Sequence, residues 1–286
     1  MMRQSNALVC LLALLPAATC FNHVQAQSLR QPSYPIFGIL QTDPQLRGSA
    51  YALAGPDAFA PLCQYRMIYT SGGPALEAVR DGRKQAGCKP PVLFEDSYIT
   101  PKGSSGKKGR KGGLQASFSP HRDDRWLRNV TNEADAARSG LRALCMIGPA
   151  GYVAAYINPA LPNYDQLMRF SWCSFLLTVT KERSTWFGLP LLIARRDGET
   201  GFLPLPEICF VPIGDPVDSN EIGKLKLPNE TCYLREFASG LVLVNPSSTS
   251  NPAVVDIPAG YVDWESKQPV SKVRLSAGDA RLLLKP

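Results

Sequence analysis

Histidine is scarce in this sequence of 286 residues, where only His23 and His121 occur. Metal sites rich in histidine are therefore excluded. His23 lies close to the N-terminus, in a segment that we interpret below as a secretory leader. His121 is then the one residue available for a histidine-dependent nucleophile relay. The eight cysteines include no CxxC pair, which argues against a zinc site or a thioredoxin-like dithiol. We therefore expect neither a metal nor a cofactor.

Charged residues are also few, at 19% of the chain. This fraction lies below the usual value of about 25% and argues against a disordered polyelectrolyte. Hydrophobic residues make up 44%, which is enough for a packed core, and the length allows one large domain or two smaller ones. Long apolar runs are missing as well, so we expect no membrane span.

The first 26 residues have the layout of a secretory leader. Arg3 provides a positive start, residues 7–16 form a short apolar run, and Val24 and Ala26 are small residues at the positions that a signal peptidase reads. We expect residues 1–26 to be a signal peptide cleaved after Ala26, and the protein to be secreted. An uncleaved anchor is the alternative.

Six cysteines remain after the leader, and an even number in an exported chain suggests disulfides. The candidates are Cys63, Cys88, Cys145, Cys173, Cys209 and Cys232, and the sequence does not choose among their pairings. Two Asn-x-Thr triplets, at Asn129 and Asn229, are candidate glycosylation sites.

The middle of the chain alternates apolar strands with amphipathic helices, a pattern typical of a parallel βα layout. Strands are expected over residues 34–40, 65–70, 92–95, 152–157, 190–194 and 208–211. Helices are expected over residues 74–86, 124–145 and 163–180, the last with a capping box of Asn163 and Gln166.

The C-terminal part differs, because short strands follow one another between turn residues with no helical period. They are expected over residues 233–237, 240–245, 253–257, 271–275 and 280–285. Such strands suit a small antiparallel β-sandwich over residues 232–286, with Phe237, Leu241, Leu243, Leu282 and Leu284 in its core.

The run Arg235-Glu-Phe237-Ala-Ser-Gly240-Leu-Val242-Leu-Val244-Asn245-Pro246 resembles the R-x-F-x-x-G-x-V-x-V-N-P signature of secreted glycoside hydrolase-like proteins. In that family the signature stands where a (β/α) barrel meets a C-terminal β-sandwich. The segment 213–216 is similar to the turn that precedes the family's sandwich. The resemblance implies an α/β fold: a partial (β/α) barrel-like domain over residues 27–231, followed by a β-sandwich over 232–286.

The resemblance further implies a hydrolase that acts on a carbohydrate, and glycoside cleavage needs two carboxyl groups. Glu95 ends a predicted barrel strand, at the edge where barrel active sites are built, and is our candidate general acid. Asp96 is a secondary candidate, although adjacent strand residues point to opposite sides. Alternatively, both acids simply end the strand and cap the following loop. The sequence offers no evident second carboxylate.

A basic loop around residues 102–113 is rich in glycine and serine and is expected to be disordered. No aromatic residue interleaves its charges, and an exported protein rarely meets nucleic acid, so nucleic acid is not an expected partner. The functional alternatives are a glycoside hydrolase-like enzyme, active or inactive, a non-catalytic secreted carbohydrate-binding or cell-wall protein, and a truncated relic without activity.

Overall fold

The structure is a computed structural model that describes a defined part of the chain. The described residues are 30–40, 67–70, 84, 92–95, 116–117, 123–139, 143–146, 164–190, 192–194, 200–202, 205–228, 230–247 and 252–286. The leader, His121, Asp96 and the basic loop lie outside them.

Six strands of the first part form one sheet. They are β1 (Ile36–Leu40), β2 (Met67–Thr70), β3 (Val92–Glu95), β4 (Ala116–Ser117), β5 (Ala143–Met146) and β6 (Thr185–Pro190). Their order is β3-β2-β1-β6-β5-β4, and every ladder is parallel. No ladder joins β3 to β4 in the described strands, so they do not close a barrel. A separate hairpin pairs β7 (Leu192–Ala194) with β8 (Thr200–Phe202).

Among the described residues, two helices accompany this sheet. They are α4 (Asp123–Arg138) and α5 (Tyr164–Leu176). The expectation of one helix over residues 124–145 is wrong in its last third, because α4 ends at Arg138 and the four apolar residues from Ala143 form β5. An apolar run this short fits a buried strand as well as a helix, and Gly140 separates the two elements.

The connector after the hairpin contains the 3₁₀ helix η3 (Glu207–Phe210) and the short helix α6 (Ile222–Leu225). The expectation of a strand over residues 208–211 is wrong. Pro206 precedes η3, and the Cys209 N–H donates back to the Pro206 carbonyl oxygen at 2.9 Å, so the backbone turns instead of extending.

The C-terminal part is antiparallel, as predicted. Its strands are β9 (Tyr233–Phe237), β10 (Gly240–Asn245), β11 (Ala253–Asp256), β12 (Val262–Asp263), β13 (Lys272–Leu275) and β14 (Asp279–Leu284). They form a four-stranded sheet in the order β12-β14-β10-β9 and a two-stranded sheet of β11 and β13. Only β12 was absent from the strands expected here.

The two antiparallel sheets enclose one apolar cluster, in which Leu241, Leu243 and Leu283 of the larger sheet meet Val255 and Leu275 of the smaller. The other face of the four-stranded sheet is buried too. Phe237, Val242 and Leu282 lie there in a second cluster with α4 and α5, and Leu284 packs at its margin. Phe237, Leu282 and Leu284, predicted for the sandwich core, therefore face the helices instead.

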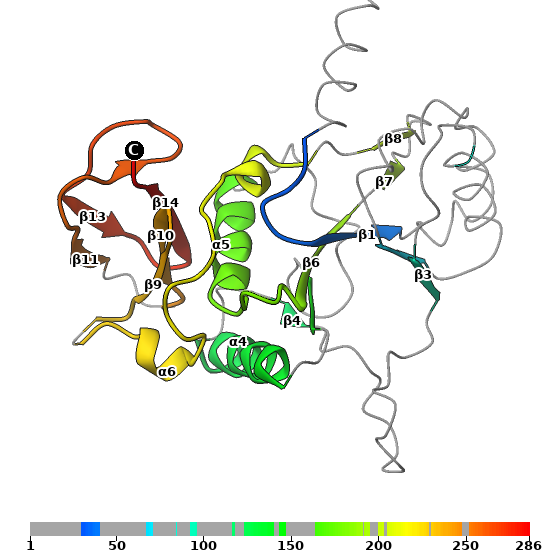
Figure 1. Ribbon diagram of the computed structural model, residues 1–286, viewed down its shortest axis with the longest axis horizontal. Helices are drawn as coiled ribbons and strands as arrows, with labels where there is room; N and C mark the ends of the chain where they lie inside the picture. The colour runs from blue at the N-terminus through cyan, green and yellow to red at the C-terminus, as the bar shows by residue number, and fades with distance from the viewer. Residues whose placement is uncertain are drawn as a thin grey trace, which may run out of the picture.

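Helix α5 lies between the four-stranded antiparallel sheet and β6 of the parallel sheet (Figure 1). Trp172 and Phe175 of α5 both contact Phe187 of β6, with ring centroids 5.1 and 5.2 Å apart. On its other side α5 packs against β10 and β14. The helix is buried all round from Phe170 to its end, as expected for a helix enclosed by two layers.

Candidate functional site

The candidate general acid Glu95 is the last residue of β3, which lies at one end of the parallel sheet. Its backbone pairs in register with Thr70, the last residue of β2, and Thr70 in turn pairs with Leu40 of β1. Three strands therefore end side by side at the carboxyl edge, where open and closed parallel sheets bind their ligands.

Each of the six strands of the parallel sheet ends in one residue, and Glu95 is the only acid among these six. The other five are Leu40, Thr70, Ser117, Met146 and Pro190. Asp96, the secondary candidate, lies outside the described residues, so its place relative to Glu95 stays a prediction.

The signature residue Arg235 serves a structural purpose in the described part of the chain. Its side chain is buried, and Nη1 donates to the carbonyl oxygens of Leu176 and Leu177, both at 2.9 Å. These carbonyls belong to the C-terminal end of α5, where no further helical N–H is present to bond them and where the helix dipole favours a cation. Nη2 donates to the Asp218 carbonyl oxygen at 3.1 Å. Burial lowers the pKa of the guanidinium to about 10, so the group stays charged at neutral pH.

Phe237, the next signature residue, is fully buried against the aromatic ring of Tyr34, with centroids 6.2 Å apart in an edge-on arrangement. Burial also raises the pKa of the Tyr34 phenol to about 12. The phenol therefore keeps its proton and donates a hydrogen bond to the carbonyl oxygen of Gly214 at 2.7 Å. Gly214 has a φ of +81°, and a Cβ there would lie 2.9 Å from that of Ala238, so this turn requires glycine.

The last signature residues shape β10. A Cβ at Gly240 would lie 2.3 Å from the Leu283 carbonyl oxygen, so a larger residue would push β14 away. At the other end of β10, the buried Asn245 side chain donates to the Leu275 carbonyl oxygen at 3.0 Å and accepts from Thr231 Oγ1 at 2.9 Å. Asn245 therefore joins β10 to β13. Packing and hydrogen bonding account for Arg235, Phe237, Gly240 and Asn245 of the signature.

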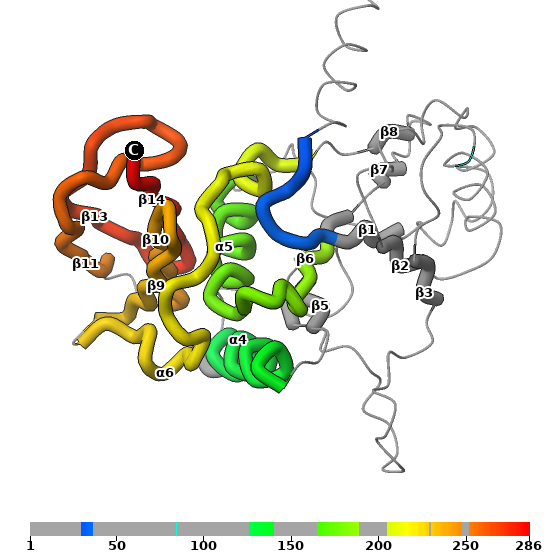
Figure 2. The backbone as a smooth tube through the Cα atoms, in the orientation of Figure 1, coloured from blue at the N-terminus to red at the C-terminus, as the bar shows by residue number. Residues whose placement is uncertain are grey.

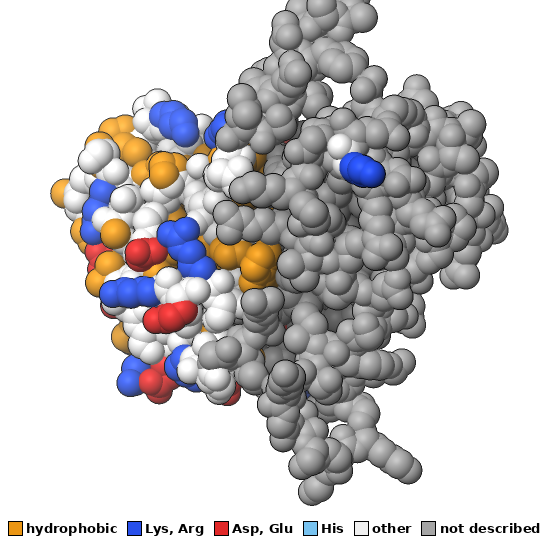
Figure 3. Space-filling model, turned by 45° about the vertical axis from the view of Figure 1, so that its right-hand side comes forward, with side chains coloured by type: hydrophobic (Ala, Val, Ile, Leu, Met, Phe, Trp, Pro, Cys, Tyr) orange, Lys and Arg blue, Asp and Glu red, His pale blue; other side chains and the backbone are white. Residues whose placement is uncertain are grey.

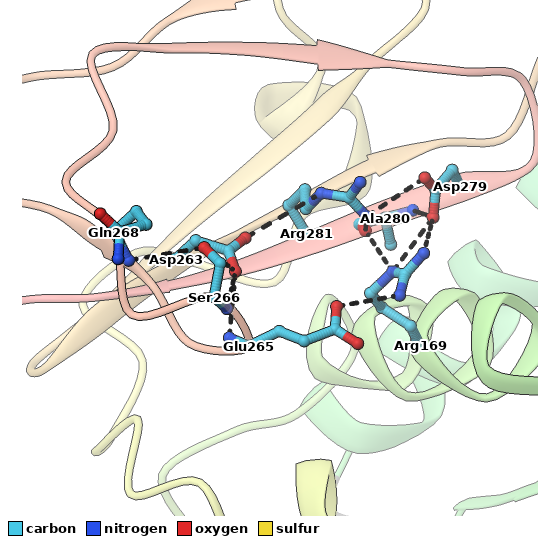
Figure 4. Close-up of polar contacts among 8 residues, drawn as sticks. All are labelled: Arg169, Asp263, Glu265, Ser266, Gln268, Asp279, Ala280 and Arg281. Carbon is cyan, nitrogen blue, oxygen red and sulfur yellow. Dashed lines mark hydrogen bonds and ion pairs between the residues drawn. The ribbon is translucent and has the colours of Figure 1, made fainter.

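A polar network connects α5 to β14 at the edge of this junction (Figure 4). Arg169 of α5 donates to Asp279 Oδ1 from Nη2 at 2.9 Å and to the Ala280 carbonyl oxygen from Nε at 2.9 Å. Arg281 approaches the other Asp279 oxygen at 3.2 Å, and Glu265 accepts from Arg169 Nη1 at 3.2 Å. Arg169 and Asp279 are only 14% and 11% exposed, which shields their ion pair from water.

Two polar residues, Gln166 and Asn220, make long-range hydrogen bonds that the local sequence does not predict. The Nε2 of Gln166 donates to the carbonyl oxygen of Gly278 at 3.2 Å, and its predicted capping partner Asn163 lies outside the described residues. The buried Asn220 amide donates to the carbonyl oxygens of Thr178 and Ala134, at 2.8 and 3.1 Å. Asn220 thereby bridges the segments at the ends of α4 and α5, and no sequence motif had marked it.

Three of the six disulfide candidates are free thiols in the described residues: Cys173, Cys209 and Cys232. This differs from the disulfide expectation. Cys173 lies in the cluster around α5 and Cys232 in the cluster between the antiparallel sheets, so these two thiols do not meet. Burial raises the thiol pKa of all three, to about 12 for Cys232. Cys63, Cys88 and the side chain of Cys145 lie outside the described part.

Of the two candidate glycosylation sites, Asn129 is on α4 with its side chain partly exposed. Asn229 is not among the described residues. Whether either carries a glycan stays a prediction. Trp126 and Trp172 are fully buried, so they pack in the core and do not offer a face to a sugar.

Charges on the described surface are mostly paired. Arg183 and Asp215 approach to 3.1 Å, and Lys272 and Asp256 to 3.2 Å. Figure 3 shows one face, on which basic and acidic side chains are interspersed. Within the described residues, no three metal-binding side chains gather closely enough to hold an ion. None of the helices among those residues has the length and apolar character needed to cross a bilayer.

Neither a family model nor a curated protein matches the sequence.

Proposed function

We propose that this chain is a secreted glycoside hydrolase-like protein that acts on or binds a carbohydrate. The observation that carries the proposal is the strand order. β1, β2 and β3 follow one another on one side, and β6, β5 and β4 on the other, with β6 beside β1. In a (β/α) barrel each strand pairs with its neighbours in sequence and the last strand pairs with the first. The observed order is the one expected for such a ring opened between β3 and β4, and it supports the proposal.

A partial barrel of six strands is the fold proposed for the first part, compared with eight in a complete barrel. The two antiparallel sheets behind α5 correspond to the β-sandwich that the resemblance implies. Arg235 and Phe237 of the larger antiparallel sheet contact the end of α5 and the ring of Tyr34. These contacts support the correspondence, because both residues belong to the signature on which the resemblance rests.

In the enzymatic form of the proposal, Glu95 protonates the leaving oxygen of the glycoside. Its position at the carboxyl edge of β3 supports this role. A second carboxyl group is required, either as nucleophile or as the base that activates water. That group would have to come from the segments that follow the strands, because the other five strand-end residues are not acids.

The presence of one acid among the six strand-end residues favours a second candidate, a non-catalytic carbohydrate-binding protein on the same scaffold. A single carboxyl at the carboxyl edge can donate or accept hydrogen bonds to a sugar but cannot complete hydrolysis alone. The two candidates therefore differ in turnover and not in ligand class.

A panel of chromogenic glycosides and a glycan array separate these candidates. Glu95→Gln is compared with Glu221→Gln, whose exposed carboxylate only pairs with Lys224 at 2.8 Å. Hydrolysis lost in the first variant and kept in the second supports the enzyme, and glycan binding without hydrolysis supports the binding protein. If wild-type protein neither binds nor cleaves any glycan in these sets, the proposed function is wrong.

A further inference from the structure

The segment of residues 30–36, which we call the N-terminal strap, lies along the connector that contains η3. Figure 2 shows it as the blue tube that leads into β1. Arg30 pairs with Glu207 at 2.8 Å, and its guanidinium lies 4.4 Å from the centroid of the Phe210 ring. The backbone N–H of Ser33 donates to the carbonyl oxygen of Cys209 at 2.9 Å. The outer half of the strap is thus bound to a segment that follows it by more than 170 residues.

The inner half of the strap enters the core between the two sheets. Tyr34 is 2% exposed, and its ring meets Phe175 of α5 and Phe237 of β9 edge-on, at 6.3 and 6.2 Å. The carbonyl oxygen of Pro35 accepts from the N–H of Phe187 in β6 at 3.0 Å. The strap therefore contacts the parallel sheet, the antiparallel sheet and the helix between them. These contacts form only when all three are in place.

The expected cleavage site lies very close to the strap. If the leader ends at Ala26, only residues 27–29 separate the cut from Arg30. Three fully extended residues span about 11 Å at most. A leader peptidase works at the membrane on exposed, unstructured chain. A chain bound to the folded protein from Arg30 onward would leave that peptidase almost no free length.

We propose that the N-terminal strap docks only after the leader has been removed, so that leader cleavage permits the last step of folding. Before cleavage the strap is held at the membrane, and the connector around Cys209 is uncovered. After cleavage Arg30, Ser33 and Tyr34 make the contacts described above and close the core. The proposal rests on the expected leader and not on the proposed carbohydrate function.

Cys209 reports on this step because its thiol is fully buried and its carbonyl oxygen is bound by the strap. The chain is synthesised with microsomes, either as wild type or as Ala26→Arg, which removes the small residue that the peptidase reads. Both products are treated with N-ethylmaleimide, and alkylation is mapped by mass spectrometry. We expect Cys209 to be alkylated at least ~10-fold faster in the uncleaved chain, because local opening controls the reactivity of buried groups.

Cys173 is the internal control, because it is a buried thiol on α5, whereas the backbone bond from the strap's Ser33 goes to Cys209. It should be protected in both products. Equal protection of Cys209 in the two products would overturn the proposal. So would alkylation of both thiols in the uncleaved chain, since that would mean general unfolding. A wild-type chain that keeps its leader would overturn both the proposal and the expected export.

A second comparison uses the processed chain alone. Tyr34→Ala removes the ring that holds the inner half of the strap, whereas Tyr34→Phe keeps the ring and removes only the hydrogen bond to Gly214. We expect Cys209 to be alkylated in Tyr34→Ala as fast as in the uncleaved chain, with Tyr34→Phe close to wild type. If Cys209 stays protected from alkylation in Tyr34→Ala, the claim that the strap covers Cys209 is wrong.

Discussion

Arg235 Nη1 lies 2.9 Å from the carbonyl oxygens of both Leu176 and Leu177, so one buried guanidinium of β9 caps the C-terminus of α5. Replacing Arg235 with Met should lower the free energy of unfolding by about 3 kcal/mol, because it leaves buried carbonyls without donors. Urea denaturation measures the change. Arg274→Met, at an exposed position of β13, should change stability by less than about 0.5 kcal/mol. Equal effects of the two substitutions would contradict the capping role.

Leu243 is fully buried between the two antiparallel sheets. Leu243→Ala should lower the free energy of unfolding by about 2–5 kcal/mol, since it removes apolar contacts and leaves a cavity. The matched control is Val254→Ala, because the Val254 side chain is 46% exposed on β11. Its effect, measured in the same urea titration, should be below about 1 kcal/mol. A small effect at Leu243 would mean that the two sheets do not share a core.

Arg169 and Asp279 should be energetically coupled, because their ion pair is largely shielded from water. A double-mutant cycle with Arg169→Met and Asp279→Asn is expected to give a coupling of about 1–2 kcal/mol. The same cycle on Arg183 and Asp215, which are 47% and 54% exposed, should give at most about 0.5 kcal/mol. Raising the salt concentration should weaken the exposed pair more than the shielded one.

Cys232 should make stability fall as the pH rises through the alkaline range. Its folded pKa of about 12 lies above the ordinary thiol value of 9.0, so the unfolded chain loses this proton first. The stabilising contribution is complete below pH 9 and declines between pH 9 and 12. By linkage, the wild type should lose about 1 kcal/mol more than Cys232→Ala between pH 8 and pH 10. Parallel pH profiles for the two proteins would show that the thiol ionises as easily in the folded chain.

Glu95→Gln should reduce glycoside hydrolysis by about 10²–10⁴-fold if Glu95 is the general acid, since this is the usual size of such assistance. The fold should be kept, as judged by circular dichroism and the urea midpoint. Asp96→Asn should have a smaller effect, because neighbouring strand residues point to opposite sides. Unchanged hydrolysis in Glu95→Gln would remove Glu95 from the mechanism.

The C-terminal strands could be predicted closely from the sequence because the signals there are local. β9 and β10 begin and end at the predicted residues, with alternating or continuous apolar residues between turn residues. β3 was also predicted at its observed bounds. In these stretches the residues that decide the conformation lie within the segment itself.

Elsewhere the deciding contacts are distant in sequence. Arg235 and Leu176 are 59 residues apart, so no local pattern could reveal that the signature arginine caps a helix. Gln166 stands at a plausible capping position but bonds Gly278, 112 residues away. The residues from Ala143 to Met146 continue the helical spacing of α4, and their pairing with β6 and β4 makes them a strand. The strand order that supports the proposed function depends on such long-range pairing throughout.

The enclosure of α5 by sheets on both sides has a consequence for how the chain melts. Phe187 of the parallel sheet and Leu282 of the antiparallel sheet belong to one apolar cluster around the helix. Loss of either sheet would expose α5 to water, so neither should persist without the other. Calorimetry should therefore record a single heat-absorption peak whose van't Hoff and calorimetric enthalpies agree, with no plateau for a surviving C-terminal half.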